Sequence, residues 1–157
     1  MPPLVTLVEK LPVKAEAAAK PYDREAFRYS PEKARPVVFQ QEQRADGSWL
    51  SRWDGRVFRS RMGMDVDHNV ALREAWDSGA STWPVARLEA FSEDPANLNA
   101  ITAGLNRSKG DQDGAWPAPL ERCAYVEQVA EVKSEYGLSI DPVEQAAMLN
   151  VAHACKG

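Results

Sequence analysis

One short polar motif constrains the fold of this chain more than any other feature. It is Asp-Val-Asp-His at 65–68, and two asparagines follow it, Asn97 and then Asn106 nine residues later. The oxygens of Asp67 and Asn106 are of the kind that a hard divalent cation prefers. The imidazole of His68 suits removal of a proton from water. The chain is therefore expected to fold so that separate segments meet at one metal site.

The motif segments are predicted to form a strand, a second strand and a helix. Residues 64–67 enter as an extended segment, which places His68 where the strand meets a loop. Residues 98–101 fit a second short strand. Thr102 is positioned to cap a helix that carries Asn106 and Lys109 one turn apart.

A helical insertion is predicted between the two strands. Residues 72–78 form its first helix, with Gly79 as the stop, and Ser81 or Thr82 caps the second. The apolar side of that second helix consists of Val85, Leu88 and Phe91.

The regions before the motif are predicted from local patterns. Residues 1–20 form an N-terminal arm or a short helix, and residues 22–29 form a short helix. Residues 36–39 and 49–51 are expected to pair as a hairpin across a turn at 45–48, and 56–58 to form another strand.

Two longer helices are predicted to close the chain as a hairpin over residues 120–155. Asp141 is placed as the N-cap of the second helix, Pro142 as its first residue and Glu144 as the partner in a capping box. The apolar side of the first helix consists of Tyr125, Val129, Val132 and Tyr136.

Length and composition predict one globular domain over residues 1–157. With 44% hydrophobic and 27% charged residues, the chain is not expected to be disordered. It has neither a long apolar run nor the pattern of a signal peptide, so we expect a soluble protein that does not bind membranes.

Charge is distributed unevenly along the chain, whose net charge is −4. Residues 20–61 contain ten basic and six acidic residues, whereas residues 110–157 contain three basic and eight acidic ones. One interpretation is that the arginines form a rim that binds phosphate groups. The alternative is that they are solvated side chains on edge strands. The arginines in question are Arg52, Arg56, Arg59 and Arg61.

The two cysteines are symmetric about the predicted helical turn. Cys123 and Cys155 each lie sixteen residues from position 139, so they face each other in an antiparallel pair of helices. A disulfide between them indicates an oxidising compartment, and the alternative is two buried thiols. Two cysteines are too few for a four-cysteine zinc site, which leaves the Asp/His/Asn cluster as the place for a metal.

The motif resembles that of the HNH endonuclease superfamily, whose ββα-metal site reads Asp-His, then Asn-Leu, then Asn with a Lys shortly after. Asp-Val-Asp-His in particular is similar to the HNH domain of the CRISPR effector nucleases. Within the superfamily the chain resembles small, often secreted bacterial nucleases related to the C-terminal domain of GmrSD-type restriction enzymes. The likeness covers nearly the whole chain, including segments 11–14, 22–24, 74–76, 78–80, 106–111 and 123–138.

The resemblance implies an α+β fold with a ββα-metal (HNH) core at 62–113, a helical insertion and a C-terminal helical hairpin. It implies that His68 is the general base, that Asp67 and Asn106 bind the metal, and that Asn97 orients the loop and the base. Asp65 is expected to contact the metal ligands and orient them without binding the metal itself. The residues expected to contact phosphate groups are Lys109, Arg107, Arg59 and Arg61.

The sequence therefore predicts a metal-dependent endonuclease that hydrolyses phosphodiester bonds of DNA. Its cofactor is one divalent ion, Mg²⁺ or Mn²⁺, with other transition metals able to replace it in vitro. The expected partner is double-stranded DNA, with RNA as the alternative, and the expected state is a monomer. A secreted or extracytoplasmic location is favoured over a cytoplasmic or mobile-element origin.

Two other classes of function are kept as alternatives. The first is a catalytically silent module that binds nucleic acid or a partner on the same fold, which the acidic net charge and Asn69 favour. Relatives usually have an apolar residue at that position. The second is an interaction protein that docks a partner through its terminal helices. Neither alternative accounts for the spacing of the motif.

Overall fold

The computed structural model describes residues 3–155 as an α+β fold, which agrees with the predicted fold class. Within that range it contains seven α-helices and two antiparallel sheets of two strands each. The strands are β1 (Trp49–Leu50), β2 (Val57–Phe58), β3 (Met64–His68) and β4 (Leu98–Thr102). The helices are α1 (Leu4–Glu9), α2 (Pro31–Glu42), α3 (Leu72–Asp77), α4 (Val85–Glu93), α5 (Ala103–Lys109), α6 (Arg122–Tyr136) and α7 (Pro142–Ala154). Three 3-10 helices are η1 (Arg24–Phe27), η2 (Ala80–Thr82) and η3 (Pro95–Asn97).

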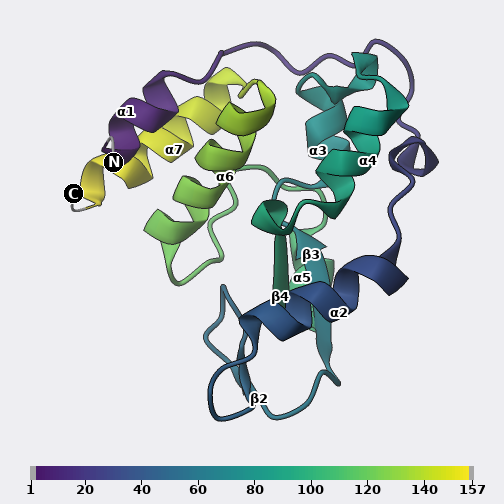
Figure 1. Cartoon of the computed structure of the whole chain (residues 1–157). Coiled ribbons are helices and arrows are strands. Elements are labelled where there is room, and N and C mark those ends of the chain that lie inside the picture. Colours follow the sequence, from purple (N-terminus) through teal and green to yellow (C-terminus); the bar gives the residue numbers. More distant parts are fainter. Residues whose placement is uncertain (1–2, 156–157) are drawn as a thin grey trace.

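Two groups of helices lie next to each other in the upper part of Figure 1, with the β3–β4 pair below them. Helix α1 lies beside α6 and α7 in one group, and α3 and α4 make the other. Helices α2 and α5 both pack on β4, all five of whose residues are buried. The main hydrophobic core lies where the two groups meet, and its largest fully buried side chains are Phe27, Trp53, Trp76, Phe91 and Tyr125.

The predicted order of strand, strand and helix around the motif is confirmed. Strands β3 and β4 are antiparallel, with Asp67 opposite Asn99 and His68 opposite Leu98, and α5 begins directly after β4. Thr102 is the N-cap residue of α5, but its side chain makes no capping hydrogen bond. Its hydroxyl instead lies 3.1 Å from the hydroxyl of Ser51, which links the end of β4 to the chain after β1.

The predicted strand at 36–39 and its hairpin with 49–51 are wrong, because these residues belong to α2. Pro31 begins the helix, where its missing N–H costs nothing. Ala34, Val38 and Phe39 are buried and pack with Trp49, Met64 and Leu98 in a second hydrophobic cluster. This one-sided burial outweighs the strand preference of the valines and the presence of Pro36 inside the helix. Strand β1 pairs with β2 instead.

The predicted helical insertion between β3 and β4 is present, but the predicted cap of its second helix is wrong. Helix α3 ends before Ser78, and Gly79 follows with φ 137°, a conformation that residues with a Cβ avoid. Residues 80–82 form η2, so neither Ser81 nor Thr82 caps α4, which begins after Pro84.

The segment after α1 crosses from the terminal helices to the insertion. Lys14 N–H donates to the carbonyl of Ile140 at 2.9 Å, and Ala17 N–H donates to that of Asp77 at 3.0 Å. The indole N–H of Trp76 then donates to the carbonyl of Lys20 at 2.9 Å. These bonds carry the chain to η1, which packs against α3 and α4.

The C-terminal helices contain the predicted disulfide between Cys123 and Cys155, so the alternative of two buried thiols is excluded. Asp141 caps α7 by accepting a hydrogen bond from Glu144 N–H at 2.7 Å, as expected. The Glu144 side chain does not complete a capping box. Its carboxylate is buried and accepts from Gly114 N–H at 2.8 Å and from Lys133 at 3.1 Å.

The disulfide closes a loop with a sequence separation of 32 residues, so its loss should release considerable chain entropy. Replacing both Cys123 and Cys155 by Ser is expected to lower the free energy of unfolding by about 3 kcal/mol. Urea denaturation followed by circular dichroism measures the change. Reductant should weaken the wild type to a similar degree and leave the double variant unchanged. Equal stability of the oxidised and reduced wild type would contradict this account.

Candidate functional site

The motif residues meet at one cavity of about 380 Å³. Asp67 and His68 reach it from the end of β3, and Asn106 reaches it from α5. The fold brings these segments together because β4 pairs along the whole of β3 and α5 contacts both strands. Tyr29 also lines the cavity, and its ring centroid lies 4.5 Å from that of His68 in an edge-on arrangement.

The geometry around His68 fixes which of its ring nitrogens carries a proton. Nε2 lies 2.8 Å from the carbonyl of Ser92, which only accepts hydrogen bonds, so Nε2 must donate. Nδ1 is then left as the proton acceptor of the ring. Burial lowers the pKa of His68 to about 4, against the effect of the Ser92 carbonyl. The imidazole is therefore neutral at pH 7.

Asp65 and Asn106 form a hydrogen bond across the strand and the helix. The Asn106 amide nitrogen donates to a carboxylate oxygen of Asp65 at 3.0 Å. Because the nitrogen end of the amide is occupied, the oxygen of Asn106 remains available as an acceptor or ligand. Asp65 thus sets the orientation of Asn106.

Asp67 is a buried carboxylate held close to a buried lysine. Lys109 Nζ lies 3.1 Å from Oδ2 of Asp67, as an ion pair whose geometry does not make a hydrogen bond to that oxygen. Burial raises the pKa of Asp67, and the charge of Lys109 opposes the rise. A buried carboxylate of this kind is well suited to bind a cation, and Lys109 already supplies one positive charge next to it.

Lys109 itself is enclosed by the fold and is not exposed to solvent. Its side chain is 0% exposed, and besides the ion pair with Asp67 it donates to the carbonyl of His68 at 3.0 Å. The structure therefore gives Lys109 a different role from the expected phosphate contact. Lys109 holds the end of β3 in place through its contacts with Asp67 and the His68 carbonyl.

Asn97 holds the loop that follows His68. Its amide oxygen accepts from Val70 N–H at 2.7 Å, and its amide nitrogen donates to the Val70 carbonyl at 3.0 Å. The carbonyl of Asn97 also accepts from Asn69 N–H at 2.8 Å. Asn97 thus orients the loop next to His68. None of these three hydrogen bonds involves the imidazole ring.

The arginines expected to bind phosphate do not line this cavity. Arg59 lies 3.6 Å from Asp46, and the guanidinium of Arg61 lies 5.1 Å from the ring centroid of Phe39. Arg107 is exposed on α5 and is absent from the cavity wall. Two other arginines line it, Arg24 and Arg73.

No motif or spacing in the sequence pointed to Arg24, Arg73 or Tyr29 as residues of the site. Arg24 lies 44 positions before His68 in the sequence, and only the fold of the N-terminal arm brings the two together. The triplet at 22–24 belonged to the wider likeness, but no chemical role followed from its residue types alone.

Two groups of acidic residues elsewhere bring carboxylate oxygens within 4.8 Å of one another. They share Asp113 and lie where α3, α6 and α7 meet. Their ammonium counter-charge is Lys133, which bonds to Glu74 at 2.5 Å and to Glu144 at 3.1 Å. The ammonium group of Lys133 therefore already supplies the positive charge of this cluster. The groups are Glu16, Glu74 and Asp113, and Asp113, Asp141 and Glu144.

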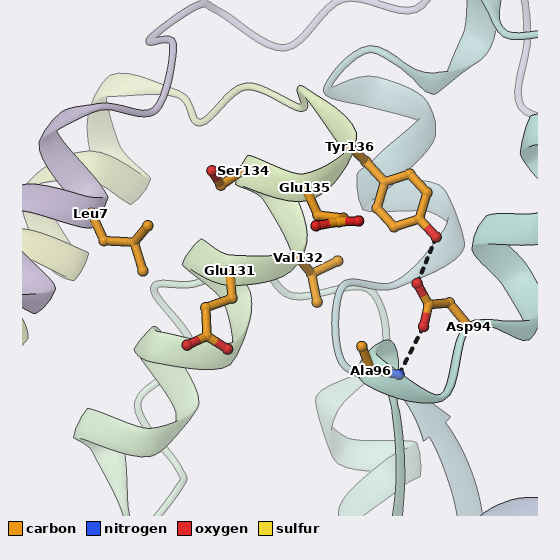
Figure 2. Close-up of a pocket in the computed structure, with 8 residues that line it drawn as sticks. All are labelled: Leu7, Asp94, Ala96, Glu131, Val132, Ser134, Glu135 and Tyr136. Carbon is orange, nitrogen blue, oxygen red and sulfur yellow. Dashed lines mark hydrogen bonds between the residues drawn. The ribbon is translucent and has the colours of Figure 1, made fainter. Parts of the chain in front are cut away.

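A larger hollow of about 750 Å³ lies between α6 and the start of η3 (Figure 2). Glu131 and Glu135 line it from α6, and Asp94 faces them. The Tyr136 hydroxyl donates to Asp94 at 2.6 Å. This hollow is acidic and contains none of the motif residues, so the smaller cavity at His68 is the better candidate site.

The fold and the site define a disulfide-bonded α+β protein with a neutral histidine, a buried carboxylate and an oriented amide around one cavity. No helix within the described residues is long and apolar enough to span a membrane. No family model matches the chain, and no solved structure matches it.

One relative is described as an uncharacterized secreted protein of Arthroderma benhamiae. It is 37% identical over 114 residues, which cover 69% of this chain and 56% of the relative. The chain thus spans about half the length of the curated relative that it matches.

Proposed function

We propose that this protein is a metal-dependent endonuclease that hydrolyses phosphodiester bonds of DNA, built on a ββα-metal core of the HNH type. The observation that carries the proposal is the shared cavity. A histidine whose acceptor nitrogen is fixed lies beside Asp67 and Asn106, at the junction of two strands and a helix.

The chain's own residues account for the handling of protons. His68 accepts a proton from water at Nδ1 while the water oxygen attacks phosphorus and the leaving oxygen departs. The Ser92 carbonyl holds the Nε2 proton and stabilises the imidazolium that forms. Asn97 and Lys109 hold the loop and the strand end, so that the ring does not have to reorganise.

Asp67 and Asn106 are the residues that would hold the divalent ion. When bound, such an ion supplies positive charge to the phosphate oxygens and to the leaving oxygen. The all-oxygen ligand set favours Mg²⁺ or Mn²⁺. Asp65 keeps the Asn106 oxygen turned away from its own carboxylate.

A ligand substitution tests the metal assignment. Asp67→Asn is expected to weaken Mn²⁺ binding by more than about tenfold, because it removes the only charged ligand of the site. Isothermal titration calorimetry of the free protein measures this without any activity assay. Asp46→Asn, an exposed carboxylate outside the cavity, is the matched control. Equal Mn²⁺ affinity in wild type and Asp67→Asn would exclude this metal site.

The second candidate is a binding module without turnover, and one observation favours it. Lys109 lies 3.1 Å from Asp67 and so provides a cation that competes with a metal. The same titration separates the candidates. A wild type that binds DNA but no Mg²⁺ or Mn²⁺ would support the binding module.

The protein's location is outside the cytoplasm. The disulfide requires oxidising conditions to persist, and the relative from Arthroderma benhamiae is described as secreted. Both observations agree with the expectation from the sequence. Within this proposal the enzyme acts as a monomer on extracellular or extracytoplasmic double-stranded DNA, with RNA as the alternative substrate.

A further inference from the structure

Two arginines and a tyrosine form one wall of the cavity at His68. Arg24, Tyr22 and Arg73 all line it. The guanidinium of Arg73 lies over the Tyr22 ring at 5.5 Å from its centroid. Burial raises the pKa of Tyr22, and the neighbouring charges of Arg24 and Arg73 oppose that rise. The three side chains are therefore close neighbours.

The two arginines differ in whether a carboxylate already pairs with the guanidinium. Arg73 lies 3.9 Å from both Asp77 and Asp111. Arg24 is exposed and makes no ion pair with any residue in the range 3–155. An arginine without a carboxylate partner at the mouth of a cavity is available for an anionic ligand.

The backbone at Arg24 is also fixed relative to His68. It begins η1, where Asp23 accepts a hydrogen bond from Glu25 N–H at 3.0 Å. At the other end of η1, Phe27 is fully buried and packs against Trp76 and Phe91. The hydroxyl of Ser92 donates to the Glu89 carbonyl at 2.8 Å and also lies 3.3 Å from the Phe27 carbonyl, and the carbonyl of the same Ser92 orients His68.

We propose that Arg24 is the centre of a phosphate-binding subsite, which holds the backbone phosphate next to the one that is cleaved. Its planar guanidinium matches two phosphate oxygens at once, in a way that a lysine does not. Arg73 positions Tyr22 along the same wall, and Asp111 limits the positive charge there. The inference rests on the proposed function, because it assigns the neighbour of a scissile phosphate.

Binding of DNA without cleavage gives the direct test. A fluorescent duplex is titrated in Mg²⁺ with protein carrying His68→Ala, so that the duplex stays intact, with and without Arg24→Ala. The second substitution is expected to raise Kd about tenfold, and to make the plot of log K against log salt shallower by about one unit. Arg24→Lys should recover only part of the affinity. Arg44→Ala, an exposed arginine outside the cavity, should change Kd less than twofold.

Two readouts separate a phosphate contact from a structural role. Arg24→Ala alone should bind Mn²⁺ as the wild type does and unfold at the same temperature. Asp111→Asn removes a negative charge from the same cavity wall and should lower Kd about twofold. If Arg24→Ala leaves both Kd and the salt slope unchanged, the subsite does not exist, whereas His68 and the metal ligands keep their proposed roles.

Failure of the proposed function has a different signature. If the protein with His68→Ala binds no duplex at any salt concentration, the nucleic-acid function and the subsite both fail. If wild type binds but never cleaves, and Arg24→Ala still reduces the salt slope, catalysis fails, whereas the contact between Arg24 and a backbone phosphate stands.

Discussion

His68→Ala is expected to lower kcat for DNA cleavage about a thousandfold while leaving Mn²⁺ affinity within about threefold of the wild type. The alanine removes the proton acceptor at the cavity, whereas Asp67 and Asn106 keep their contacts with Lys109 and Asp65. Single-turnover cleavage of a labelled duplex at saturating Mg²⁺ measures the loss. Metal titration on the same sample shows whether the site has stayed intact.

His153→Ala is the matched control, since His153 is the only other histidine and is exposed on α7. Its kcat should equal that of the wild type. A His68→Ala enzyme that keeps at least a tenth of the wild-type kcat would exclude His68 as the general base.

Lys133→Met is expected to lower the free energy of unfolding by about 3–5 kcal/mol, the largest stability effect that we predict. The Lys133 side chain is 0% exposed and bonds to Glu74, Glu144 and the carbonyl of Ser139. Removing it leaves two buried carboxyl groups without a cation. Urea denaturation at pH 7 measures the loss. Lys33→Met, on the exposed side of α2, should change stability by less than about 0.5 kcal/mol.

The same cluster predicts how stability changes with pH. Burial raises the pKa of Glu74 to about 9 and that of Glu144 to about 7, and Lys133 only partly opposes the rise because one ammonium faces two carboxyl groups. Both values exceed the 4.5 of an ordinary glutamate, so the folded state binds more protons than the unfolded state between about pH 5 and pH 9. Stability should therefore fall as pH rises through this window.

Glu74→Gln tests the source of this pH dependence. The amide keeps an oxygen for Lys133 and cannot ionise, so the decline in stability between about pH 7 and pH 9 should flatten. Thermal unfolding over that range compares the variant with wild type. An equally steep decline in Glu74→Gln would show that the dependence arises elsewhere.

Local sequence patterns were sufficient for the elements that carry the motif. The extended segment at 64–67, the short strand at 98–101 and the helix after Thr102 were predicted within one or two residues of β3, β4 and α5. The symmetric positions of the two cysteines about residue 139 predicted their disulfide. Helix α2 was missed because Pro36 disfavours a helix interior and the two valines favour a strand, whereas burial of Val38 and Phe39 on one face decided the outcome.

The wall of the cavity was not predictable from local patterns. Arg24 reaches the site only because the arm at 12–20 hydrogen-bonds to α3 and to the turn before α7. Lys109 looked like a surface phosphate ligand from its position after Asn106, yet tertiary packing encloses it beside Asp67. Such burial depends on residues far apart in the chain.

The activity that we propose is metal-dependent cleavage of DNA at the cavity of His68. Its most direct test is incubation of supercoiled plasmid with wild type and with His68→Ala, in EDTA, Mg²⁺ or Mn²⁺, followed by electrophoresis over time. We predict nicked and then linear plasmid only with wild type and a metal. Cleavage by wild type in EDTA, or undiminished cleavage by His68→Ala, would contradict the account.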